Sequence, residues 1–168
     1  GLEMAWNGYL AKIQDQKFFP KKLKPLPVNA LLTSDLDDLK TLAEQLNEAN
    51  YKAVKMKVGV KSIEEEIKRI LILKTHLKQN IALRLDANRG WTLDEALEFA
   101  SGIKGIKIEY CEEPLKNPEQ LDSFLEKSDL PIALDETLFN TEKPELLPKS
   151  NITAIILKPS RLGGWKSC

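Results

Sequence analysis

The chain has 168 residues, 42% of them hydrophobic and 30% charged, which is enough for one domain with a buried core. Its 25 basic and 25 acidic residues balance, so charge gives no reason to expect nucleic acid or an anionic membrane as a partner. No apolar run approaches the roughly 20 residues of a membrane-spanning helix. The first residues lack the basic-then-apolar order of a signal peptide, and Cys111 and Cys168 form no CxxC pair. We therefore expect a cytoplasmic protein with free thiols.

The first 27 residues differ from the rest of the chain. Residues 2–16 have a helix-like pattern, and residues 18–27 are rich in Pro and Lys. Such a segment is typical of a linker. We interpret residues 1–27 as the remnant of a preceding domain followed by a linker.

From residue 28 onward, short β-branched apolar runs alternate with segments of helical periodicity. The runs cover residues 28–33, 53–58, 81–86, 105–112, 131–135 and 152–158. Helix starts between them are marked by Ser62 with Glu65, by Thr92 with Glu95, and by Asn117 before a proline. The alternation predicts six parallel strands joined by right-handed helical crossovers.

The predicted fold class is therefore α/β, and units of roughly 20–30 residues suit a (β/α) barrel. A complete barrel has about eight strands, so we expect residues 28–168 to form an incomplete barrel with about six of them. An open doubly wound sheet is the alternative.

Two lysines share one face of the second predicted strand. Because strand side chains alternate, Lys55 and Lys57 point the same way. Inside a barrel, burial and like charge would lower their pKa values, and a lysine near neutrality can abstract a proton. The alternative is a half-exposed strand with an outer Lys-Lys face.

Three successive predicted strands end in a carboxylate: Asp86, Glu112 and Asp135. One such residue is more often a cap or a turn residue than a ligand. However, neighbouring parallel strands lie about 4.8 Å apart, so three can converge on one cation. Oxygen ligands of this kind favour Mg²⁺, with Mn²⁺ as a substitute.

Lys158 ends the sixth run, which is otherwise almost wholly apolar and predicted to be buried on both faces. Its amine is then expected at the barrel mouth, unless it extends into solvent. A substrate carboxylate at the cation would lie between Lys57 and Lys158. Removal of its α proton would give an enediolate whose charge the cation stabilises.

Five motifs occur in the order found in the muconate-lactonizing branch of the enolase superfamily. They are KMKVG (55–59), LRLDANRGWT (83–92), CEEPL (111–115), LDET (134–137) and LKPSRLGG (157–164). The chain resembles that branch from about residue 28 to residue 164, and residues 2–6 resemble the helix that joins its capping domain to its barrel. Most of the capping domain and two barrel strands are expected to be missing.

The resemblance implies a role for each matched residue. It assigns the metal ligands to Asp86, Glu112 and Asp135, and the catalytic lysines to Lys57 and Lys158. It assigns the supporting shell to Lys55, Arg84, Asn88, Glu113 and Glu136. Lys57 would act as acid and base, with Lys158 as its partner across the site.

Within the branch, the motifs are most similar to the o-succinylbenzoate synthases of menaquinone and phylloquinone biosynthesis. These are Mg²⁺-dependent lyases that dehydrate a succinyl-hydroxycyclohexadiene carboxylate, so the implied partner is a small carboxylate substrate. Two alternatives stay open: an N-acylamino-acid racemase or dipeptide epimerase of the same branch, and an inactive truncated fragment. The sequence does not indicate the oligomeric state.

Overall fold

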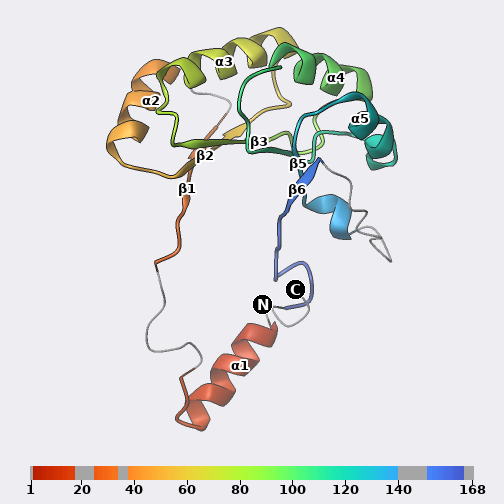
Figure 1. The fold of residues 1–168 in the computed structure, drawn as a ribbon. Coiled ribbons are helices and arrows are strands. Elements are labelled where there is room, and N and C mark those ends of the chain that lie inside the picture. Colours follow the sequence, from red (N-terminus) through yellow and green to blue (C-terminus); the bar gives the residue numbers. More distant parts are fainter. Residues whose placement is uncertain (1, 18–24, 34–37, 140–150, 165–168) are drawn as a thin grey trace.

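Six parallel strands form one sheet, and its strand order follows the chain from β1 to β6 (Figure 1). The computed structural model describes residues 2–17, 25–33, 38–139 and 151–164. The strands are β1 (Asn29–Leu32), β2 (Ala53–Lys57), β3 (Ala82–Asp86), β4 (Tyr110–Glu112), β5 (Ile132–Leu134) and β6 (Ile152–Ile155). The predicted α/β class and strand order are confirmed.

Helices connect the strands as the periodicity predicted. They are α2 (Leu39–Glu48), α3 (Ile63–His76), α4 (Leu93–Gly102) and α5 (Leu121–Lys127), with short 3₁₀ turns η1 (Pro118–Gln120) and η2 (Glu136–Phe139). Helix α1 (Leu2–Ile13) precedes β1 and connects no strands. No helix among the described residues is long and apolar enough to cross a membrane.

Two of the predicted capping motifs differ in how they form. At α4, the Thr92 side chain accepts from Glu95 N, and Glu95 Oε2 accepts from Thr92 N, which is a complete capping box. At α3, Ser62 accepts from Glu65 N, but the Glu65 carboxylate instead pairs with Lys61 at 2.7 Å. The start of α3 is therefore capped from one side only.

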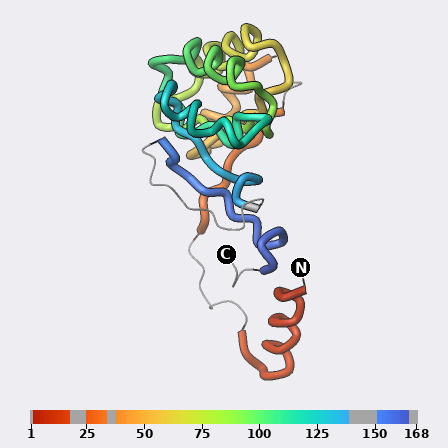
Figure 2. The backbone as a smooth tube through the Cα atoms, turned by 90° about the vertical axis from the view of Figure 1, so that its right-hand side faces the viewer, coloured from red at the N-terminus to blue at the C-terminus, as the bar shows by residue number. Residues whose placement is uncertain are grey.

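The core lies between one face of the sheet and helices α2 to α5, which cover that face (Figures 1 and 2). Met56, Leu83, Leu85 and Cys111 are completely buried in this layer. The alternate positions of the same strands carry polar side chains, which therefore lie on the opposite face of the sheet. That polar face carries the predicted site residues.

The expectation that the sixth strand is buried on both faces is wrong. Ile155 is 42% exposed and Leu157 is 54% exposed. β6 pairs only with β5 in the described sheet and is one of its two outer strands, so one side of it remains open.

Helix α1 lies apart from the layered body, beside the segment that follows β6 (Figure 2). It has no buried residues. Its Glu3 side chain abuts the backbone of Gly164, where an added Cβ would lie 1.4 Å from the carboxylate. The division of the chain at residue 27 remains a prediction.

Candidate active site

Charged side chains meet at the carboxyl ends of the central strands. In the sheet register, Lys57 is opposite Asp86, and Asp86 is opposite Glu112. Asp135 follows β5, the next strand. Parallel pairing thus places the three predicted carboxylates on successive strand ends at one edge of the sheet.

Lys55 lies between two of these carboxylates. Its Nζ is 2.8 Å from Asp86 Oδ2 and 2.6 Å from Glu112 Oε2. Burial acts to lower the pKa of Lys55, but the hydrogen bonds to both acids outweigh it and raise the pKa above its usual value. The predicted lowering by like charge is therefore wrong for Lys55, whose nearest charged groups are acids.

Glu112 is only 2% exposed. Burial raises the pKa of Glu112 to about 7, with the bond from Lys55 opposing the rise and the charges of Asp86 and Asp135 adding to it. The hydrogen bond from Lys55 therefore does not offset the cost of ionising Glu112 in its buried position.

Lys158 pairs with Asp135 across the end of the sheet. Asp135 is fully buried, whereas the Lys158 side chain is 42% exposed. The hydrogen bond to Asp135 raises the pKa of Lys158, so this amine is a stable ammonium. The second carboxylate oxygen of Asp135, Oδ1, is buried and has no hydrogen-bond partner among the described residues.

Lys57 is exposed at the end of β2. Unlike Lys55, it makes no hydrogen bond or ion pair within the described part of the chain. The position of its amine is therefore set by the backbone that carries Lys57, not by a partner side chain of the described residues.

Glu113 connects three segments of the site. Its carboxylate accepts from Asp135 N at 2.8 Å, from Thr137 N at 2.7 Å, from Thr137 Oγ1 at 2.7 Å and from Arg89 Nε at 3.2 Å. Its φ of 43° is a costly backbone conformation for a residue with a side chain. Glu113 thereby fixes the backbone that carries Asp135.

The other predicted supporting residues are less closely connected to the carboxylates. Asn88 contacts Asp86 through its backbone N, at 3.3 Å from Oδ1. Glu136 has one buried oxygen without a partner in the described structure. Arg84 turns away from the three acids, because its guanidinium is held by both oxygens of Glu109 and by Asn29.

Sequence reasoning gave no role to Arg89 or Thr137, which complete the bonds of Glu113. Both lie inside matched motifs, in DANRGWT and LDET. Each is a polar residue shortly after a predicted metal ligand in the chain: Arg89 follows Asp86, and Thr137 follows Asp135. That position was the signal that could have identified them.

The residues present fit a divalent cation. The donors are hard oxygens, the buried Oδ1 of Asp135 lacks a partner among the described residues, and burial together with the charges of Asp86 and Asp135 raises the pKa of Glu112, which a cation would oppose. As the side chains lie, however, the described residues contain no group of three acidic, His or Cys side chains close enough to enclose a metal. Lys55 and Lys158 take the place of a cation in this arrangement.

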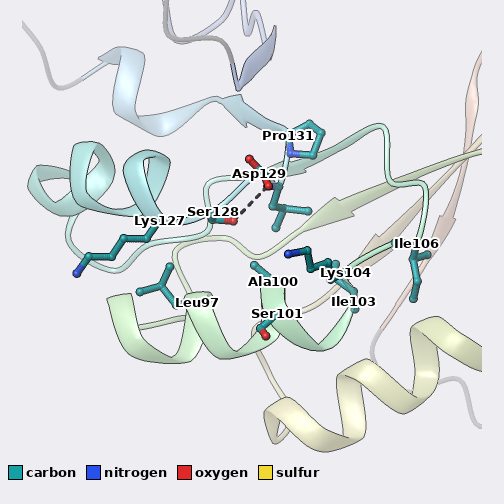
Figure 3. Close-up of a pocket in the computed structure, with 12 residues that line it drawn as sticks. Leu97, Ala100, Ser101, Ile103, Lys104, Ile106, Lys127, Ser128, Asp129 and Pro131 are labelled. Atoms are coloured by element: carbon teal, nitrogen blue, oxygen red, sulfur yellow. Dashed lines mark hydrogen bonds between the residues drawn. The ribbon is translucent and has the colours of Figure 1, made fainter.

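A pocket of about 220 Å³ lies elsewhere, between the ends of α4 and α5 (Figure 3). It is lined by residues 97, 100–101, 103–106 and 127–131, which precede β4 and β5. It is therefore at the amino ends of the strands, opposite the carboxylates, and takes no part in the candidate site.

Two curated proteins are similar to this chain over most of its length. The o-succinylbenzoate synthase of Aliivibrio fischeri is 35% identical over 144 residues, covering 82% of this chain and 42% of that protein. The L-amino acid-D/L-Glu epimerase of Francisella philomiragia is 26% identical over 174 residues, covering 97% of this chain and 48% of that protein. The chain thus spans less than half the length of these curated relatives.

A solved structure shows the same fold. The o-succinylbenzoate synthase of Thermosynechococcus elongatus BP-1, complexed with magnesium in its active site, superposes with a TM-score of 0.62 at 33% identity. The match covers 77% of this chain and 42% of that chain. A family model described as enolase C-terminal domain-like matches residues 38–168. The chain therefore belongs to the enolase C-terminal domain-like family, and its six-stranded sheet corresponds to part of the barrel of that superfamily.

Proposed function

We propose that the protein is a Mg²⁺-dependent carbon–oxygen lyase that acts as an o-succinylbenzoate synthase. The observation that carries this proposal is the row of three carboxylates on successive strand ends, with a lysine at either side of it. The motifs around these residues and the similarity to two o-succinylbenzoate synthases support the same activity.

Asp86, Glu112 and Asp135 would hold the Mg²⁺. When bound, the ion supplies positive charge that stabilises the charge developing on a substrate carboxylate. Lys55 would keep Asp86 and Glu112 oriented, since it already bonds to both. Glu113 would do the same for Asp135 through its backbone N.

The two remaining lysines would act on the substrate from opposite sides. Lys57 would take the proton α to the carboxylate and then help the hydroxyl group to leave. Lys158 would stay protonated and stabilise the negative charge, in line with its raised pKa.

Substitution of single site residues tests this proposal. We expect Lys57→Ala to reduce Mg²⁺-dependent dehydration of the succinyl-hydroxycyclohexadiene carboxylate at least about 10³-fold, because the proton acceptor is lost. Mg²⁺ affinity, measured by calorimetry, should stay nearly unchanged. Asp135→Asn should instead weaken Mg²⁺ binding, because it removes a charged oxygen ligand.

Lys52→Ala is the matched control, because Lys52 is an exposed lysine just before the same strand, at its far end. Turnover by Lys57→Ala at the wild-type rate would refute the proposed role. An absence of both Mg²⁺ binding and turnover in the wild-type chain would favour the inactive-fragment interpretation.

An epimerase of the same family is the second candidate. It is favoured by lysines on two sides of the site, since epimerisation requires a base on each face of the α carbon, and by the similarity to the Francisella philomiragia enzyme. Lys158→Arg separates the two activities. A synthase should retain part of its turnover because the charge persists, whereas an epimerase should lose α-proton exchange for one of the two epimers.

A further inference from the structure

The loop that follows Lys57 is fixed to the neighbouring loop by its backbone. Val58 N donates to Asp86 O at 2.9 Å. Gly59, with a φ of 83°, packs directly on Gly90, where an added Cβ would lie 2.5 Å from Gly59 O. Two residues after Lys57, the chain is therefore in close backbone contact with the neighbouring loop.

A buried carboxylate fixes the next two residues of the same loop. Glu66, in the first turn of α3, is only 2% exposed, and its Oε1 accepts from Val60 N at 2.9 Å and from Lys61 N at 3.0 Å. Its other oxygen, Oε2, is buried without a partner in the described structure. The neighbouring Glu64 and Glu65 are exposed, so Glu66 differs from them by its position under the loop.

Burying such a group is costly unless its hydrogen bonds compensate. The two bonds of Glu66 both go to the loop backbone, and neither goes to the rest of the core. The carboxylate thus holds a segment only three residues beyond the exposed amine that reacts in the proposed function.

We propose that Glu66 is a positioning residue for Lys57, holding the β2–α3 loop so that the Lys57 amine faces the substrate carbon. The inference rests on the proposed function, because it requires Lys57 to act as the base. A displacement of about 1 Å at a reacting group can cost about 100-fold in rate. A small shift of the β2–α3 loop would therefore produce a measurable loss of kcat.

Three variants of the intact natural protein test the inference. Glu66→Ala removes the acceptor, so kcat should fall about 10- to 100-fold while KM and Mg²⁺ affinity stay within about twofold. Glu66→Gln keeps an acceptor oxygen and should recover most of kcat. Ile70→Ala is the matched control: Ile70 is fully buried on the same helix, so its loss destabilises α3 while the Glu66 carboxylate and its hydrogen bonds to the loop are retained.

Rates are expressed per folded molecule, and amide hydrogen exchange of Val60 and Lys61 is followed alongside them. Exchange at both amides should accelerate in Glu66→Ala and stay at the level set by global unfolding in Ile70→Ala. Equal loss of kcat in Glu66→Ala and Ile70→Ala, or no loss in Glu66→Ala, would overturn the inference. Failure of the proposed function is distinct, because the wild-type protein itself would then lack turnover.

Discussion

The charge balance of the site is decided at individual residues. Glu112 is buried beside two other acids, and burial is the main reason that its pKa rises to about 7. Lys55 donates to it at 2.6 Å and acts in the opposite direction. In the absence of a divalent cation, Glu112 is therefore a source of instability whenever it is ionised.

This makes a prediction about pH and stability. In the unfolded chain the pKa of Glu112 is near the usual value of 4.5, and burial raises it to about 7 in the folded chain. Between these values the folded state binds the additional proton, so this group stabilises at low pH and loses that contribution as pH rises through 7. The free energy of unfolding of metal-free protein should fall by up to about 3 kcal/mol from this group alone.

Urea unfolding between pH 4.5 and 8 measures this effect, with Glu112→Gln as the comparison. The wild-type minus variant difference should decrease with pH across this window. A difference that is flat or increases with pH would show that Lys55, not burial, dominates the environment of Glu112.

For single residues, the sequence predicted that the three carboxylates lie at one edge of the sheet. Strand alternation and parallel pairing fix the position of each Cβ, so this part of the site follows from spacing along the chain. The sequence did not predict which side chains pair. Lys55 reaches across to Glu112 on a strand two places away, and Arg84 turns back to Glu109. Such pairings depend on side-chain length and on neighbours from distant segments, which spacing along one strand does not encode.

At the scale of elements, the loops after β2 and β3 are locked together by two glycines. A Cβ at Gly90 would lie within 2.9 Å of three backbone atoms, namely Gly59 O, Gly59 Cα and Ala87 O. Backbone atoms cannot rotate away as a flexible side chain can. The close contact of the two loops therefore requires glycine at this position.

We predict that Gly90→Ala lowers the free energy of unfolding by about 3 kcal/mol, the upper end of the cost of overpacking. Gly105→Ala is the contrast: its φ is 85°, but nothing lies within 4 Å of an added Cβ. It should cost only about 1–2 kcal/mol of backbone strain. Urea unfolding of both variants measures the difference, and equal costs would contradict the clash.

Element boundaries were predicted less well than element types. The run 105–112 is a strand only over Tyr110–Glu112. Gly105 has a left-handed φ and Ile106 N bonds to Ile103 O, so these residues form the turn that ends α4. Apolar composition alone does not separate such a turn from the strand that follows it.

At the scale of the whole molecule, the sheet has one face covered by helices and one face open. The outer strands β1 and β6 carry apolar side chains on their exposed positions: Leu31 is 67% exposed and Ile155 is 42% exposed. The exposure of Ile155 follows from the position of β6 as an outer strand of the sheet, which pairs only with β5 in the described structure. On β1, Leu31 is exposed on the same face as the polar residues Asn29 and Thr33, so an apolar side chain interrupts a polar face there.

Exposed apolar side chains on outer strands favour edge-to-edge association. We predict that the 168-residue chain on its own associates with rising concentration, as measured by sedimentation velocity. The double variant Leu31→Lys, Ile155→Lys should shift the distribution to monomer, because charge at a strand edge opposes pairing. Its unfolding by urea should change little, since both side chains are exposed.

Leu71→Lys is the control for this prediction. Leu71 is 47% exposed on α3, which is not an edge strand, so this variant should leave association unchanged. A chain that is monomeric at every concentration, or association equal in wild type and the double variant, would show that these strands are not its cause.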